Sequence, residues 1–242
     1  VEHGYFTGHA ASFLHLKMGS ATLENCSFVN NTVSKGFINV YSGRNMVIRN
    51  CLFEKNFAYE HSTCVMNYGN CVIYNSKFYN NRASSWAGGI TTYRNGNTTI
   101  YDSEFKGNLA GWNGGALYCY NILNVYNTVF EDNNCTTNNG GGAIGACQFE
   151  GIPRMYIDGC LFKSNNNLCW ALDALSTSGT GRGGAISFMD VGSIEVRNTV
   201  FIANSASIGT AICAIEAGSY GSPDIIIVNN TFINHTRAGD VL

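Results

Sequence analysis

Carboxylate side chains are the first place to look for chemistry in this chain, and they are few. Aspartate and glutamate together number 16 among 242 residues. An enzyme that cleaves glycosidic bonds needs two carboxyl groups close together, and a Ca²⁺ site needs a cluster of them. Glu24 and Asp158 are each followed one sequence repeat later by an arginine, Arg49 and Arg197, which predicts structural ion pairs. The sequence therefore indicates no catalytic residue, no metal site and no cofactor.

Tyrosine is a better candidate for binding than carboxylate is for catalysis. Tyr74, Tyr101 and Tyr126 recur at intervals of 27 and 25 residues. Stacked on one outer face, they could form a platform for sugar rings or a surface for a partner protein. Ordinary aromatic pairing between neighbouring strands would give the same pattern. Both interpretations of this candidate ligand stripe stay open.

Two other features bear on binding. Residues 168–182 interrupt the sequence repeat, which makes them the most plausible unique binding loop. The three tryptophans, Trp86, Trp112 and Trp170, each follow a repeated phenylalanine by seven or eight residues. We expect them to plug turn corners rather than to face a ligand.

Six Asn-x-Ser/Thr sequons mark candidate sites of N-glycosylation. They begin at Asn25, Asn30, Asn97, Asn134, Asn229 and Asn234. Asn30 and Asn134 lie in predicted turns, where a glycan could project. Asn25 and Asn229 occupy a position that the fold can use for its own turns.

Ten cysteines offer two candidate disulfides. Cys26 and Cys51 hold equivalent positions in neighbouring repeats, where a spacing of about 4.8 Å between strands would bring their Cα atoms within disulfide range. They form either a disulfide or two stacked thiols that pack as small apolar groups. Cys135 and Cys169, in loops of adjacent repeats, are the second candidate pair. No C-x-x-C motif occurs, so a zinc site is not expected.

All of these residues are positioned by a repeat of about 25 residues. Eight phenylalanines mark it, at Phe28, Phe53, Phe78, Phe105, Phe130, Phe162, Phe201 and Phe232. Seven of them are followed three residues later by asparagine, at Asn31, Asn56, Asn81, Asn108, Asn133, Asn165 and Asn204, and the eighth by His235. Self-similarity at this period is typical of a stacked solenoid.

Each repeat contains two segments with strand character. An aliphatic residue stands five positions before each phenylalanine and a mostly apolar residue seven positions before, which is the alternation of a half-buried strand. A second block reads Gly-Gly-Ala and then Ile or Leu in its best copies, as at residues 114–117, but has lost its glycines near Cys64. Glycine pairs allow a sharp bend with positive φ and a close backbone approach.

These patterns together predict an all-β fold. We expect a single-stranded parallel β-helix of about eight to nine coils, with the phenylalanines and the asparagines stacked in two structural ladders. We expect residues 1–242 to form a single domain that is a fragment of a longer chain or filament, because neither end supplies a recognisable capping segment. Places where the repeat departs from its rule are the places to expect a specific function.

The amino-acid composition bears on which classes of binding partner to expect. The net charge is −2 and only 12% of the residues are charged, which gives no electrostatic reason to expect nucleic acid or an anionic membrane surface. No apolar run reaches the length that a membrane span requires.

The joint repetition of F-x-x-N and G-G-A-[I/L/V] resembles the chlamydial polymorphic membrane proteins and related adhesin-like β-helix proteins. Seven copies of the first motif and three full copies of the second carry this resemblance over nearly the whole chain. It implies a right-handed parallel β-helix, exposure at the cell surface, and a role in adhesion or surface architecture.

We therefore expect a non-enzymatic extracellular β-helix, either a cell-surface adhesin or a stalk, or else a glycosylated filament subunit. Its partners would be copies of itself joined end to end, or a receptor or glycan on a host or cell surface. The alternative is a carbohydrate-active β-helix enzyme, a polysaccharide lyase or glycoside hydrolase. Two carboxylates within about 5–10 Å in a groove would favour that alternative.

Overall fold

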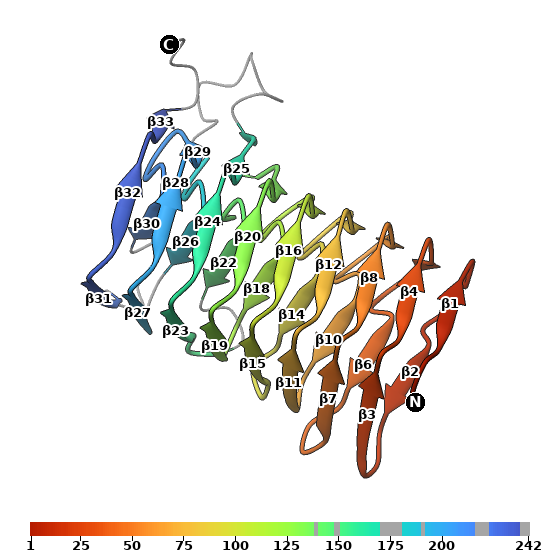
Figure 1. The fold of residues 1–242 in the computed structure, drawn as a ribbon. Coiled ribbons are helices and arrows are strands. Elements are labelled where there is room, and N and C mark those ends of the chain that lie inside the picture. The colour runs from red at the N-terminus through yellow and green to blue at the C-terminus, as the bar shows by residue number, and fades with distance from the viewer. Residues whose placement is uncertain (138–139, 148–150, 170–180, 190–191, 216–222, 238–242) are drawn as a thin grey trace.

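The fold is a stack of coils in which equivalent strands pair in parallel along one axis (Figure 1). The computed structural model describes residues 1–137, 140–147, 151–169, 181–189, 192–215 and 223–237. Each full coil contributes four strands, and these strands form four sheets. Strands β1 to β3 lie at one end of the stack and β31 to β33 at the other. The predicted parallel β-helix is confirmed.

Two sheets carry the repeated phenylalanines and tyrosines. The phenylalanine sheet consists of β1 (Tyr5–Thr7), β4 (Ser27–Val29), β8 (Leu52–Glu54), β12 (Lys77–Tyr79), β16 (Glu104–Lys106), β20 (Val129–Glu131), β24 (Leu161–Lys163), β28 (Val200–Ile202) and β32 (Thr231–Ile233). The tyrosine sheet consists of β3 (Ser20–Glu24), β7 (Asn45–Arg49), β11 (Asn70–Tyr74), β15 (Asn97–Tyr101), β19 (Ile122–Tyr126), β23 (Arg154–Asp158), β27 (Ser193–Arg197) and β31 (Asp224–Val228).

The other two sheets complete each coil. The glycine sheet, which follows the Gly-Gly blocks, consists of β2 (Leu14–Leu16), β6 (Ile38–Val40), β10 (Val65–Asn67), β14 (Ile90–Thr92), β18 (Leu117–Cys119), β22 (Ile144–Cys147), β26 (Ile186–Met189) and β30 (Ile212–Ile215). The short sheet consists of β5 (Thr32–Val33), β9 (Phe57–Ala58), β13 (Arg82–Ala83), β17 (Leu109–Ala110), β21 (Asn134–Cys135), β25 (Asn166–Asn167), β29 (Ser205–Ala206) and β33 (Thr236–Arg237). Eight strands in a sheet span seven turns, slightly fewer than the predicted eight to nine coils.

The core is a column of phenylalanine rings. Neighbouring rings lie 4.5–5.1 Å apart between centroids and are tilted by only 3–16°. The column has nine members rather than eight, because Phe6 of β1 stacks on Phe28. Phe6 was not predicted from the sequence, because its interval to Phe28 is shorter than the others and its motif carries His9 instead of asparagine. The rings from Phe28 to Phe201 are completely buried.

The repeated asparagines form a buried ladder beside this column. In one rung, the Nδ2 of Asn81 donates to the Oδ1 of Asn108 (3.1 Å) and to the carbonyl of Phe53 (2.9 Å). The backbone N–H of Asn81 donates to the same Oδ1 (3.0 Å). His235 ends the row with a ring nitrogen 3.2 Å from the carbonyl oxygen of Phe201. Each coil thus satisfies the buried polar groups of the next.

Positive φ angles occur mainly at the two corners that flank the phenylalanine sheet. They are rare in the Gly-Gly pairs, which lie at residues 88–89, 114–115, 141–142 and 183–184. The first corner has them at Asn25, Asn50, Asn75, Asp102, Asn127, Gly159, Asn198 and Asn229. These residue types tolerate the left-handed region better than others do. Among the four Gly-Gly pairs only Gly183 has a positive φ, so the expected bend is wrong for the rest. Their role is close approach: a Cβ on Gly115 would lie 2.0 Å from the carbonyl oxygen of Gly142.

Candidate binding groove

A groove with a volume of about 790 Å³ lies on the outer side of the glycine sheet, over its first coils. Every residue of β6, β10 and β14 is buried, although alternate side chains of a strand point to opposite faces. The outward-pointing members, Asn39, Met66 and Thr91, lie side by side in register. Residues that flank the strands cover these side chains, and they form two walls on this face of the coil. Asn39 and Met66 line the groove itself.

One wall is a row of tyrosines that directly follow the strands. Tyr41 follows β6, Tyr68 follows β10, Tyr93 follows β14 and Tyr120 follows β18. The first three line the groove, and Tyr120 continues the row beyond it. The rings of Tyr68 and Tyr93 stack at 4.0 Å with 13° between their planes. The backbone fixes this wall, because the N–H of Tyr68 donates to the carbonyl of Val40 in the preceding coil (2.8 Å).

The opposite wall consists of Ser34, Lys35, His61 and Trp86. His61 lies just before the place where the Gly-Gly pair is lost, since Ser62 pairs with Ala87 in the next coil. The His61 ring lies 4.0 Å from the Trp86 ring. Trp86 reaches the tyrosine wall, with its centroid 5.4 Å from that of Tyr93. The two walls therefore meet at Trp86.

Beyond these aromatic rings, the lining is polar and basic. Hydroxyl and amide groups come from Ser12, Ser34, Asn39, Ser42 and Asn95, and basic side chains from His15, Lys35, His61 and Arg94. No carboxylate is among the described residues that line the groove. Glu60 lies just outside, 2.9 Å from the Lys35 ammonium, and its hydrogen bond with Lys35 lowers the pKa of this carboxyl.

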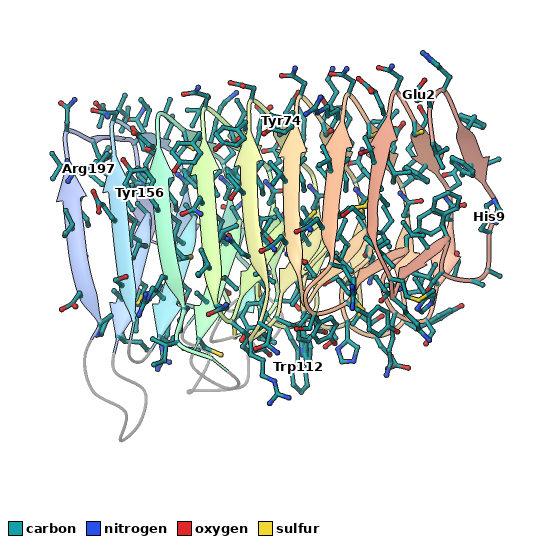
Figure 2. The ribbon with its side chains drawn as sticks, turned by 90° about the horizontal axis from the view of Figure 1, so that it is seen from below. Glu2, His9, Tyr74, Trp112, Tyr156 and Arg197 are labelled. Atoms are coloured by element: carbon teal, nitrogen blue, oxygen red, sulfur yellow. The ribbon has the colours of Figure 1, made fainter. Side chains whose placement is uncertain are left out.

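The predicted tyrosine stripe lies on another face of the coil. Figure 2 shows Tyr74 and Trp112 projecting from opposite sides of the stack. Ring centroids are 5.1 Å apart between Tyr74 and Tyr101 and 5.0 Å apart between Tyr101 and Tyr126, with nearly parallel planes. The rings cover one another's faces, which leaves edges and hydroxyls for any ligand. A role in binding for this stripe stays a prediction.

The tryptophan prediction was wrong for the two described residues. Trp86 faces the groove instead of plugging a corner, and Trp112 is 59% exposed. Trp170 and residues 170–180 of the predicted binding loop lie outside the described residues. The row from Tyr41 to Tyr120 was the missed signal, at intervals of 27, 25 and 27 residues.

The two predicted ion pairs are replaced by other contacts. The strand register does place Glu24 beside Arg49, but Arg49 lies over the Tyr74 ring, 5.2 Å from its centroid. Arg197 forms its ion pair with Glu195, two residues earlier on the same strand. Arg49 thus contacts an aromatic ring of the next coil instead of Glu24, and Arg197 pairs within its own strand instead of with Asp158.

Asp158 has neutral partners instead of the predicted arginine. It accepts hydrogen bonds from the hydroxyl of Tyr156 (3.2 Å) and from the amide of Asn198 (2.8 Å). Figure 2 shows Tyr156 and Arg197 on neighbouring strands. This polar cluster on the tyrosine sheet lies beside a smaller cavity of about 260 Å³, whose lining includes Glu195 and Asp224.

The structure contains neither candidate disulfide, and Cys26 and Cys51 take the alternative arrangement of two stacked thiols. Cys26 and Cys51 do lie together, but each thiol donates to the carbonyl two residues back, at 3.2 and 3.1 Å. Ser76 uses its hydroxyl in the same way (2.8 Å), so these thiols substitute for a hydroxyl ladder. Burial raises the pKa of Cys51 to about 11. A neutral thiol is a weak nucleophile for disulfide formation.

The second predicted pair, Cys135 and Cys169, is also brought close in space. Burial raises the pKa of Cys135 to about 11, and the nearby Cys169 adds to the shift. The Cys135 thiol donates to the carbonyl of Trp112 (3.1 Å). Both cysteine pairs are thus neighbours without a bond between them.

The sequon asparagines differ in accessibility. Asn25, Asn30, Asn229 and Asn234 have positive φ and are exposed at the corners of the phenylalanine sheet. Asn134 is half-buried and donates to the carbonyl of Asp132 (2.7 Å). The Oδ1 of Asn97 is buried without a hydrogen-bond partner. Glycosylation stays a prediction, which the four corner sites fit best.

In the described part of the chain, no helix is long and apolar enough to cross a bilayer. Nor do three His, Cys, Asp or Glu side chains gather there in a way that could hold a metal ion.

Comparison with known proteins identifies the fold family. The sequence model for a right-handed β-helix region matches residues 12–180. No curated protein and no solved structure matched. The likeness to polymorphic membrane proteins and adhesins is finer than this match and stays a prediction. With more than half of its length matched, the chain belongs to the right-handed β-helix family.

Proposed function

We propose that this chain is a non-enzymatic β-helix of the cell surface that presents the groove of the glycine sheet as an adhesive binding site. The groove is the single observation that carries this proposal. It combines four aromatic side chains with hydroxyl, amide and basic groups and has no carboxylate among its described lining residues. Such a mixture suits recognition, because aromatic surface supplies affinity and polar groups supply orientation.

The scaffold suits presentation of such a site. The phenylalanine column and the asparagine ladder run through successive coils. This packed core holds the residues of the groove walls in fixed positions. Rigid walls lower the entropic cost of binding. Exposed sequon asparagines at the corners would carry glycans on an extracellular protein.

A carbohydrate-active enzyme is the second candidate, and one observation favours it. Glu195 and Asp224 come from neighbouring strands, β27 and β31, and line the same small cavity. Two carboxylates are the usual requirement for glycosidic hydrolysis. Against this reading, the Glu195 carboxylate is already engaged by Arg197, so a substrate would have to displace that ion pair to reach it.

The test has two parts. Antibody against the chain should label intact cells of the source organism, and treatment with an N-glycosidase should lower the mass of the native protein. Incubation of the protein with acidic and neutral polysaccharides should release neither reducing ends nor unsaturated sugars. Release that disappears in Glu195→Gln and in Asp224→Asn would replace our proposal with the enzyme.

The filament form is a narrower version of the proposal, in which copies associate end to end. Electron microscopy of native material separates it from the adhesin form. Filaments whose width matches one coil stack would support it, and isolated particles would exclude it.

A further inference from the structure

We propose that the groove binds an acidic oligosaccharide, with a uronic-acid carboxylate at Arg94 and sugar rings against Trp86 and the exposed Tyr41. This inference rests on the proposed function, because it names the ligand class of the same groove. Three observations lead to it: the type of lining, the state of the backbone at both walls, and the balance of charge.

The lining suits a sugar. The face of an aromatic ring is weakly negative and attracts the C–H groups on the apolar face of a pyranose. Trp86 is half-buried at the point where the walls meet, so part of its indole remains accessible. Ser12, Ser34, Ser42 and Asn95 surround these rings with hydroxyl and amide groups, which can exchange hydrogen bonds with sugar hydroxyls.

The backbone argues against an extended peptide as the ligand. Peptides that lie along a sheet gain affinity by pairing with a free strand edge. Here both walls are already tied to their neighbouring coils: the N–H of Tyr93 donates to the carbonyl of Asn67 (2.8 Å), and that of Gly36 to the carbonyl of Ser62 (2.8 Å). Recognition must therefore come from side chains, as it does for sugars.

Charge selects an acidic ligand. Four basic side chains line the groove, and none of its described lining residues is acidic. Lys35 shares its charge with Glu60. Arg94 is exposed and has no salt bridge to another described residue. A guanidinium in this state can bind a carboxylate through two parallel hydrogen bonds.

The size of the site also fits. A volume of about 790 Å³ lies within the range of about 300–1,000 Å³ that holds drug-sized ligands. The lining residues come from four successive coils, from Ser12 to Asn95. A ligand of several linked rings, laid along the coil axis, would contact each of these coils in turn.

Isothermal titration calorimetry at low ionic strength tests the inference. The probe is a hyaluronan tetrasaccharide, and its matched control is the same tetrasaccharide with both carboxylates reduced to alcohols. We expect the acidic probe to bind at least about tenfold more tightly than the reduced one, the ratio that about 1.4 kcal/mol supplies. Added salt should narrow that ratio.

Matched variants locate the site. Arg94→Gln should remove the preference for the acidic probe and leave the affinity for the reduced probe unchanged, whereas Arg49→Gln, on the tyrosine sheet, should change neither. Trp86→Ala should lower the affinity for both probes, and Trp112→Ala, at an exposed position, should lower the affinity for neither. Each variant is compared with the parent by its thermal unfolding midpoint, and Arg94→Gln, an exposed position, keeps the test valid if Trp86→Ala fails to fold.

Other results would overturn the inference. Equal affinity for the two tetrasaccharides would refute the acidic ligand. Binding of a polyglutamate peptide but of neither sugar would make an acidic peptide the occupant. Binding that Trp112→Ala abolishes and Trp86→Ala spares would move the site elsewhere. Each of these outcomes leaves cell-surface labelling and the absence of depolymerisation intact, so failure of the ligand class is distinguishable from failure of the proposed function.

Discussion

The phenylalanine sheet and the glycine sheet belong to the same coils, yet they treat their central residues in opposite ways. On the phenylalanine sheet the central side chain points inward and hardly varies, and its two neighbours are partly exposed. On the glycine sheet the central side chain points outward, is buried under two walls, and changes from Asn39 to Met66 to Thr91 along the stack. Repeated positions build the coil, and varied positions on one outer face build the site.

The largest expected effect tests the constant half of this comparison. Phe78→Ala removes one ring from the middle of the column, where it stacks at 4.8 and 4.5 Å on its neighbours. We expect the free energy of unfolding to fall by about 3–5 kcal/mol, measured by urea denaturation, because the coils on either side cannot collapse into the gap. Phe57→Ala, at a half-buried site on the short sheet, is the control. A loss no larger than that of the control would contradict the role of the column.

The asparagine ladder should be the next most sensitive feature. Asn108→Ala would leave the N–H of Asn81 and the carbonyl of Phe78 without their side-chain partners. It would also remove one of the two hydrogen bonds that the Nδ2 of Asn81 donates. Orphaned buried groups cost about 1–3 kcal/mol each, and water admitted to the gap offsets part of this, so we expect a net loss of about 2–3 kcal/mol in urea unfolding.

The control for the ladder is Asn70→Ala, which removes an exposed amide that donates to Asn45 (3.0 Å). That change should cost less than about 0.5 kcal/mol. Similar losses for the two variants would show that the buried ladder contributes no more than surface amides do.

A third pair of changes compares two equivalent positions that precede the glycine sheet, Gly115 away from the groove and Thr63 beside it. Gly115→Ala would place a Cβ 2.0 Å from the carbonyl oxygen of Gly142 and 2.6 Å from the nitrogen of Asn134. We expect a loss of about 1–3 kcal/mol from overpacking, again in urea unfolding. Thr63 holds the equivalent position beside the groove, and Thr63→Gly should cost only about 0.5–1 kcal/mol. Tolerance of alanine at Gly115 would mean that the close coil contact is not required.

The smallest effect concerns the outer face of the phenylalanine sheet, where Glu131 bridges Lys106 and Lys163 at 2.7 Å each. Hydrogen bonds from these two lysines lower the pKa of Glu131. Its stabilising contribution is therefore present above the ordinary glutamate pKa of about 4.3 and is lost as the pH falls through the lowered value. Glu131→Gln should lower the urea midpoint slightly at pH 7 and not at all at pH 2. A larger difference at the lower pH would contradict this assignment.

The sequence alone was sufficient for the fold because the repeated residues are the ones that every coil needs. The phenylalanine must stack on its neighbours, and the asparagine must form hydrogen bonds with the buried polar groups of the next coil. The residue type at these positions therefore cannot vary, and its period is visible in a single sequence. Phe6 was not predicted, because its interval to Phe28 is shorter than the other intervals and its coil also replaces that asparagine with His9. The residues that fill the core could thus be predicted from their sequence intervals.

The groove could not be predicted in the same way. Its walls come from residues just outside the strands. The tyrosine row repeats, but the facing wall changes its residue type from coil to coil, as from His61 to Trp86. One departure from the repeat did point to the place, because the lost glycine pair at residues 62–63 adjoins His61. Which side chains gather there depends on how the loops cover the glycine sheet, and that is a property of the folded coil.

The ladders carry a consequence for the growth of such chains over evolutionary time. Each coil contacts its two neighbours through the same column and the same amide row, so a whole unit can be duplicated or deleted at a distance from the groove without disturbing it. Every such event would move the groove by about 4.8 Å along the axis. The height at which the protein holds its site is thereby adjustable in fixed steps, independently of what the site recognises.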